Sequence, residues 1–273
     1  MNRSSITKPV SDFRFIDQLT VAVDRGVPDP LARAPNASLE NLGALIEAAV
    51  LCQTNSLLAP LVNRSKDRGL VKSLTAAQES PLEIAIGSLA AKSWGFMALC
   101  ETTVQELRDR LYVFQLAARK AMCFRGQASK AKAKLCGAIG EMVDNIIDHS
   151  NAVSSGVVAF CGEEQRFEVS VGDAGIGVLA SLRTNPKFSY LQDSGTAMSV
   201  AIQDGNSRYG PLQDRGYGFG TLFRALTTLD ASIRFRSGDY ALESSGRSPT
   251  ERTAKASQKG TLNGFVISVR LDL

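Results

Sequence analysis

The chain has 273 residues, of which 44% are hydrophobic and 21% are charged, and its formal net charge is +4. This length and composition predict one large domain or two small ones with an ample core, and they exclude a largely disordered protein. The charge is too small to indicate nucleic-acid binding without a localised basic patch. The most apolar run, residues 81–100, contains Glu83 and Lys92 and is too interrupted to cross a bilayer.

The cysteine and histidine content limits the chemistry. Five cysteines lie far apart and form no Cys-x-x-Cys pair, which favours reduced thiols over a disulfide framework or a zinc site. Because no signal peptide opens the sequence, we expect a soluble cytoplasmic protein. His149 is the only histidine. This excludes a multi-histidine metal site, and also a phosphoacceptor histidine elsewhere in the same chain.

Residues 1–105 are expected to form an all-helical module used for packing, dimerisation or partner binding. Four prolines predict an irregular start over residues 1–37. The apolar spacing then predicts a helix over residues 38–50, capped by Ser38, and helical periodicity resumes over residues 81–94. This part of the sequence contains no catalytic constellation.

The second part, residues 106–273, is expected to be an α+β domain. Thr102 or Thr103 is a candidate cap for a helix that runs to about residue 125, and a second helix follows over residues 140–150. After it the period changes from 3.6 to 2, which predicts strands at 156–161, 166–171, 232–236 and 265–271. Residues 246–259 are polar and are expected to form an exposed loop. This order predicts a two-layer α/β sandwich, in which a mixed sheet carries its helices on one face.

The helix at residues 140–150 has two chemically different faces. One side carries apolar residues at the spacing of a core-facing stripe. The other side carries Glu141, Asp144, Asn145 and Asp148, with His149 at its edge. No lysine or arginine is present there to form i,i+4 pairs, so this face repels itself unless something positive lies over it. It is either a solvated acidic face or a place for hydrated Mg²⁺, which prefers a few oxygen ligands.

Two glycine-rich loops follow this helix. In the first, Asp173 stands at the end of a predicted strand and is followed by Gly175 and Gly177, which permit close approach of a ligand. A carboxylate in this position can accept a hydrogen bond from an exocyclic amine such as the N6 group of adenine. The second loop places three glycines before an apolar helix, an arrangement that binds anions through backbone N–H groups: Gly216, Gly218 and Gly220. Neither loop has the spacing of a Walker A or Rossmann motif.

The ordered set of a Glu-x-x-x-Asn helix, Asp-x-Gly-x-Gly and Gly-x-Gly-x-Gly resembles the GHKL ATPase superfamily. This superfamily includes gyrase, the ninety-kilodalton heat-shock chaperone, histidine kinases and MutL. The resemblance covers about Leu107 to Leu273 and implies a Bergerat ATP-binding fold that binds ATP and Mg²⁺. It implies that Glu141 orients the attacking water and that Asn145 is the Mg²⁺ ligand.

The resemblance also assigns nucleotide contacts. It implies that Asp173 binds adenine, that Gly175 and Gly177 shape the adenine pocket, and that Thr261 reaches adenine through water. It also implies that a second loop binds the phosphates: Gly216, Gly218 and Gly220. To these contacts we add Asp148 on the acidic face. Residues 178–214 would be a lid over ATP, in which Arg208 or Arg215 either meets the terminal phosphates or is a solvated surface charge. His149 is either a polar cap near the helix end or a phosphoacceptor.

These expectations lead to three readings of function. The first is a histidine-kinase-like regulatory subunit that phosphorylates or controls a separate protein. The second is an ATPase switch in which nucleotide changes the contacts of the N-terminal module, which can also hold two copies of the chain together. The third is a non-catalytic, nucleotide-gated interaction module. Because the sequence stops directly after its last predicted strand, we expect no transducer domain of the gyrase or MutL kind and no nucleic-acid partner.

Overall fold

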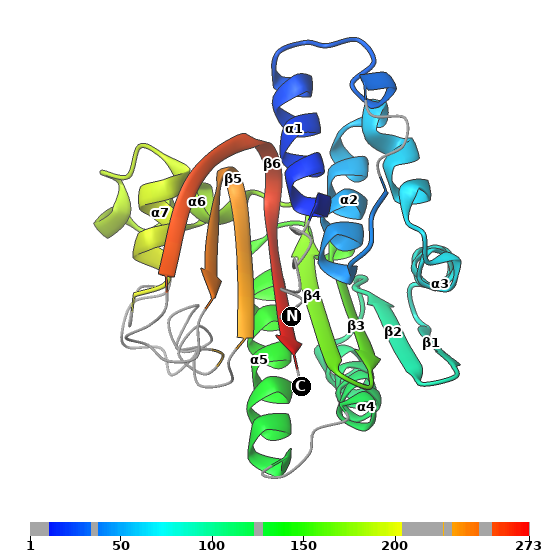
Figure 1. Ribbon diagram of the computed structural model, residues 1–273. Coiled ribbons are helices and arrows are strands. Elements are labelled where there is room, and N and C mark those ends of the chain that lie inside the picture. The colour runs from blue at the N-terminus through cyan, green and yellow to red at the C-terminus, as the bar shows by residue number, and fades with distance from the viewer. Residues whose placement is uncertain are drawn as a thin grey trace, which may run out of the picture.

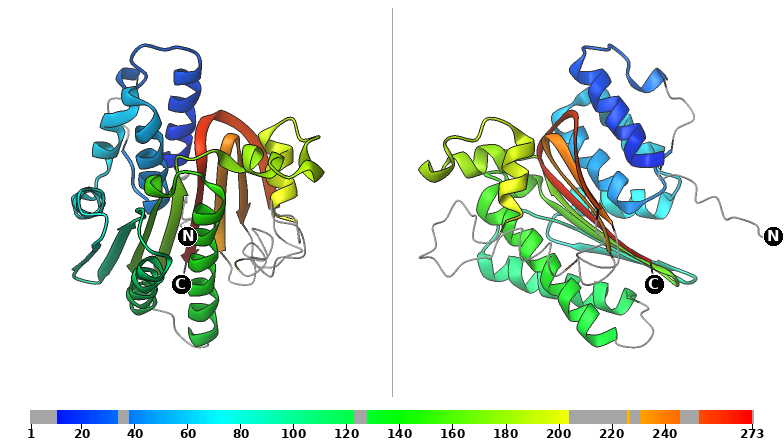
Figure 2. Two further views of the ribbon diagram at one scale, coloured as in Figure 1. Left: turned by 180° about the vertical axis from the view of Figure 1, so that it is seen from behind. Right: turned by 60° about the vertical axis from the view of Figure 1, so that its left-hand side comes forward.

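The computed structural model describes residues 11–33, 38–122, 128–203, 226, 231–245 and 253–272. Within them, an antiparallel sheet of six strands has the order β1-β2-β3-β4-β6-β5. Helices cover both faces of this sheet (Figures 1 and 2). The main elements are α1 (Ser11–Asp24), α2 (Leu42–Thr54), α3 (Arg68–Glu79), β1 (Ile84–Leu89), β2 (Lys92–Ala98), α4 (Val104–Ala121), α5 (Ala128–His149), β3 (Val157–Glu163), β4 (Arg166–Asp173), α6 (Gly177–Arg183), α7 (Ser194–Ala201), β5 (Ala231–Ser245) and β6 (Thr253–Asp272).

Two hydrophobic cores lie on opposite faces of the sheet. The first lies under α4, α5, α6 and α7, and the second lies under α1, α2 and α3. The sheet needs both layers because its central strands are apolar on both sides: in β3, every residue from Val157 to Gly162 is buried. The helices expected within residues 106–273 do lie on one face. The N-terminal helices supply a third layer on the other face, so the two-layer arrangement is incomplete.

The helices α4 and α5 confirm the predicted cap and the predicted apolar stripe, although α4 ends at Ala121, before residue 125, and α5 begins at Ala128, before residue 140. Thr103 caps α4 in a capping box, since its side chain accepts from the Glu106 N–H and the Glu106 side chain accepts from the Thr103 N–H. The apolar stripe of α5 is completely buried: Leu135, Ile139, Met142, Val143 and Ile146. This stripe packs α5 against β4. On the polar face, Asp144 is exposed, Glu141 and Asp148 are half-buried, and Asn145 is buried.

The all-helical description of residues 1–105 is wrong. The stretch 81–94, expected to be helical, forms the hairpin of β1 and β2, which are joined by six consecutive residue pairs from Ile84↔Met97 to Leu89↔Lys92. The indole N–H of Trp94 donates to Ser73 Oγ at 2.8 Å, which fixes this hairpin under α3. Since β2 also pairs with β3, the sheet continues across the boundary expected between residues 105 and 106.

Four further predictions need correction. The stretch expected to be irregular contains α1, because none of its prolines lies within that helix. The cap of α2 is Asn41, whose side chain accepts from the Ala44 N–H at 2.7 Å, and not Ser38. Residues 253–259 are part of β6, where backbone pairing with β5 makes a strand of a polar stretch. The sheet is antiparallel at every described pairing and not mixed.

A cluster of buried charges joins the N-terminal helices to β5. Arg234 and Arg236 lie on β5 and are bound by Glu47 of α2 and Asp17 of α1. The Glu47 carboxylate is completely buried. Burial alone would raise the pKa of Glu47, but the charges of the two arginines outweigh burial and lower it. In the part of the chain that the structure describes, no helix has both the length and the apolar character to cross a membrane.

Candidate functional site

Asp173 lies at the end of β4 and is 0% exposed. Its Oδ1 atom accepts a hydrogen bond from the Gly175 N–H at 2.7 Å. Its Oδ2 atom is buried and has no hydrogen-bond partner among the described residues. Burial raises the pKa of Asp173 to about 7, although the backbone N–H groups of Gly175 and Phe265 oppose the change. The site therefore contains a buried carboxyl group with one unsatisfied oxygen.

The turn after Asp173 is held against the end of α5. The Ile176 N–H donates to the Ser150 carbonyl oxygen at 2.9 Å. A Cβ atom on Gly175 would clash with that same oxygen, so only glycine permits this approach. Gly177 begins α6 with a φ of +74°, a left-handed conformation that favours glycine. The structure thus brings Asp173, Gly175 and Gly177 together with the helix that carries Glu141 and Asn145.

The polar face of α5 repels itself, as the sequence predicts. Burial and the charge of Asp144 raise the pKa of Glu141. Burial and the charge of Asp148 raise the pKa of Asp144, and Arg108 opposes this change. Arg108 lies on α4, so the neighbouring helix supplies a positive charge that the sequence of α5 does not contain.

Asn145 is oriented by its own helix. It is 6% exposed, and its Nδ2 donates to the Glu141 carbonyl oxygen at 2.8 Å. That bond leaves the Oδ1 atom as the side chain's remaining polar group, and no hydrogen bond to it is found among the described residues. An amide oxygen held in this way can serve as a ligand for a hard cation. Within the same residues, no group of three or more His, Cys, Asp or Glu side chains is arranged to hold a metal ion.

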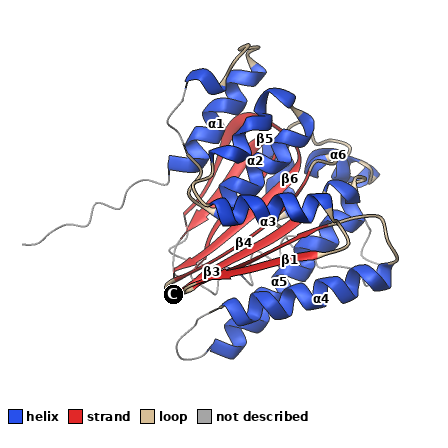
Figure 3. Ribbon diagram, turned by 90° about the vertical axis from the view of Figure 1, so that its right-hand side faces the viewer, coloured by secondary structure: helices blue, strands red, loops and turns tan. Residues whose placement is uncertain are grey.

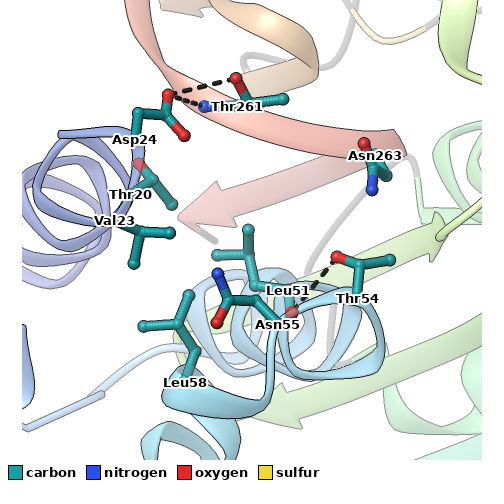
Figure 4. Close-up of a pocket in the computed structure, with 9 residues that line it drawn as sticks. All are labelled: Thr20, Val23, Asp24, Leu51, Thr54, Asn55, Leu58, Thr261 and Asn263. Atoms are coloured by element: carbon teal, nitrogen blue, oxygen red, sulfur yellow. Dashed lines mark hydrogen bonds between the residues drawn. The ribbon is translucent and has the colours of Figure 1, made fainter. Parts of the chain in front are cut away.

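Thr261 lies on the other side of the sheet from α5. Its N–H and its Oγ1 both donate to Oδ2 of Asp24 in α1, at 2.7 and 3.1 Å (Figure 4). Both residues line a cavity of about 180 Å³ between α1, α2 and β6 (Figure 4). Because α1 and α5 cover opposite faces of the sheet (Figure 2), Thr261 is directed away from the Asp173 side. The structure does not group it with the other predicted nucleotide contacts.

Part of the predicted site lies outside the described residues. Gly216, Gly218 and Gly220 belong to this part, as do Arg208 and Arg215. The expected lid, residues 178–214, is described only to residue 203. There it contains most of α6, a 3-10 helix at Pro186–Phe188 and α7, and α7 packs on β5.

Two residues that support the Asp173 turn were not identified from the sequence. Ser237 Oγ donates to the Gly264 carbonyl oxygen at 2.7 Å and accepts from the Val178 N–H at 3.0 Å. Gly264 has a φ of +79°, and a Cβ atom there would clash with the Asp173 carbonyl oxygen. The sequence signal for Gly264 is a glycine directly before a predicted strand. Ser237 has no local signal, because its partners are distant in sequence.

The site can accept a hydrogen-bond donor at Asp173 and a hard cation at Asn145. It also holds Glu141 with a raised pKa on the same helix as Asn145. No model of a known protein family matches the sequence, and no curated protein matches it.

Proposed function

We propose that this protein binds ATP and Mg²⁺ with a Bergerat fold of the GHKL kind, and that the Asp173 turn and the polar face of α5 form the site. The observation that carries the proposal is the buried Asp173 Oδ2 atom, which has no hydrogen-bond partner among the described residues. An unsatisfied buried oxygen costs about 1–3 kcal/mol, and more when it is charged. The exocyclic amine of adenine is a donor that would remove this cost.

Contacts between the Asp173 turn and α5 support the same proposal. Gly175 and Ile176 pack on the Ser150 carbonyl at the end of α5, so both halves of the site belong to one packed unit. Asn145 would hold Mg²⁺ through Oδ1, since its Nδ2 is engaged by the Glu141 carbonyl. Bound Mg²⁺ would supply positive charge for the phosphates and for the acidic face.

Glu141 is proposed as the group that orients and deprotonates the attacking water. Its pKa is raised by burial and by Asp144, which moves it toward the range that suits a general base. With turnover, the protein would act as a cytoplasmic ATPase switch or kinase-like subunit that controls a separate protein. Without turnover, the same site would serve as a nucleotide-gated interaction module.

The test is stabilisation of the chain by Mg-ATP, with Asp173→Asn as the variant. At a ligand concentration about 100-fold above Kd, the free energy of unfolding should rise by about 2.7 kcal/mol. In the variant, Oδ1 can still accept from Gly175, so the new NH₂ group takes the place of Oδ2 and faces the adenine amine, donor against donor. Asp173→Asn should therefore lose most of the stabilisation.

The matched control is Asp272→Asn, at the opposite end of the paired strands β4 and β6 from Asp173, where Asp272 pairs with Arg166. This variant should be stabilised as much as the wild type. Equal stabilisation of the wild type and Asp173→Asn, or none of the wild type, would overturn the proposal.

A further inference from the structure

The strand β1 forms an uncovered edge of the sheet. Among the described strands it is the outermost, and there it pairs only with β2. Figure 3 looks onto this edge, where β1 runs between α3 and α4 and no described element lies over it. The backbone groups on the outer side of Ile84–Leu89 have no hydrogen-bond partner among the described residues. Such a row of free N–H and C=O groups is a template for another strand.

The edge of β1 has none of the features that usually protect an edge strand. Its sequence, IAIGSL, has no charge and no proline, and its pairing with β2 runs without a register shift. The edge at the other end of the sheet differs in its charge and in its register. There β5 carries the inward-pointing Arg234 and Arg236, and its register shifts at Ser237–Gly238. Natural sheets use these devices to prevent edge-to-edge pairing.

Large apolar side chains are exposed along the same edge. Leu82 is 66% exposed, Ile86 is 55% exposed and Leu89 is 74% exposed. Ile86 lies two residues after Ile84, which packs against the core beneath α4, so the two side chains point to the same face. The edge therefore offers apolar contacts as well as free backbone groups.

We propose that β1 pairs antiparallel with β1 of a second copy of this chain, so that two six-stranded sheets form one continuous sheet. A second copy suits this edge because the strand is uncharged, and self-pairing therefore places no like charges opposite each other. A twofold axis perpendicular to the sheet through Ile86 sets that residue opposite its own copy. The same axis pairs Ile84 with Ser88 and keeps the helices of both copies on matching faces. This proposal does not depend on nucleotide binding.

The geometry can be tested by disulfide formation in Ile86→Cys. Directly opposed residues of an antiparallel pair have Cα atoms about 4.5–5.5 Å apart, which a disulfide can span. The matched control is Ser88→Cys, an exposed position on the same face, whose two copies would be about 14 Å apart. Under mild oxidation, peptide mapping should find the disulfide between the two copies of residue 86 in the first variant, and no disulfide between the two copies of residue 88 in the second. The native cysteines are present in both. No disulfide in Ile86→Cys, or equal yields, would overturn the pairing.

The association itself can be measured by sedimentation equilibrium of the full chain over a range of concentrations. The wild type should form dimers, and Ile86→Lys should weaken the association constant at least about tenfold, because two lysines would then face each other. Tyr190→Lys, an equally drastic change at a residue that is 62% exposed near α7, should have no effect. Circular dichroism checks that both variants fold. A wild type that is monomeric throughout would overturn the proposal and leave the edge to an extended segment of another protein.

Discussion

Replacing Asp173 with asparagine should remove a large pH-dependent contribution to the free energy of unfolding, so the variant should gain stability relative to the wild type as the pH rises. Burial raises the pKa of Asp173 to about 7 from an ordinary value of 3.8. Between these pH values the folded chain holds a proton that the unfolded chain releases. The stabilisation is therefore complete below the unfolded pKa and is lost as the pH rises through the folded pKa. At 1.36 kcal/mol per pKa unit, the whole effect is about 4 kcal/mol.

The assay is urea denaturation at several pH values for the wild type and Asp173→Asn. Burial also raises the pKa of Glu141, Asp144 and Glu168, so the effect of Asp173 is read from the difference between the two proteins. This difference should change by about 1.4 kcal/mol per pH unit between about pH 4.5 and 6.5 and become flat above about pH 8.

The control for the pH series is again Asp272→Asn, an exposed acid at the end of β6, whose stability should follow the wild-type pH dependence. If Asp173→Asn gave a curve parallel to that of the wild type, Asp173 would have an ordinary pKa in the folded protein. The argument that its Oδ2 atom is buried without a partner would then fail.

Three further substitutions test other parts of the structure. Glu141→Ala should abolish ATP turnover in a phosphate-release assay and leave stabilisation by Mg-ATP nearly intact; retained turnover would rule out its role as the base. Glu47→Gln should lower the free energy of unfolding by about 3 kcal/mol, because it breaks the buried charge cluster. The control Glu243→Gln, at the exposed rim of the cluster, should lower it by less than about 1 kcal/mol. Equal losses would contradict the burial of the cluster. Gly175→Ala should lower the free energy of unfolding by about 2 kcal/mol in urea denaturation, because the new methyl group meets a backbone carbonyl oxygen. The control Gly137→Ala, in open space on α5, should be neutral or stabilising. A neutral Gly175→Ala would show that the turn is not held against α5.

Two predictions that depend on local sequence were confirmed. The capping box at Thr103 and the buried stripe of α5 follow from side chains within a few residues of one another. The contact between the end of α5 and the Asp173 turn brings two of the three motifs of the GHKL resemblance side by side, and the roles of their residues stay predictions. Of those motifs, the third lies outside the described residues, so Gly216, Gly218 and Gly220 remain predictions.

Two predictions of secondary structure were wrong because strand pairing overrides the pattern within a segment. Residues 81–94 have a spacing that also suits a helix, but they form strands because β1 pairs with β2 and β2 pairs in turn with β3. Residues 253–259 are polar and become a strand because β5 pairs with them. The position of Thr261 depends on Asp24, which is 237 residues away in the chain. No local pattern in the sequence contains these partners.

The unsatisfied Asp173 oxygen is a different kind of case. The sequence indicates an acid at a strand end, but its burial results from packing by Phe265 and Gly264 of β6 and by the end of α5. The shifted pKa follows from this burial and not from neighbouring charge. A sequence pattern can therefore identify the residue, whereas the property that supports a ligand proposal depends on the folded structure.

A short segment of β6 connects the two helical layers. The Gly260 carbonyl accepts from Arg236 in the charge cluster below α1, and Thr261 binds Asp24 of α1. Four residues later, Phe265 pairs with Asp173 on β4. A movement of the Asp173 turn on nucleotide binding would have to be accommodated by this strand, because Gly264 is already in contact with the Asp173 carbonyl oxygen. Under the proposed ATP switch, the signal to the N-terminal helices would pass along β6, through direct packing contacts and not across a flexible linker.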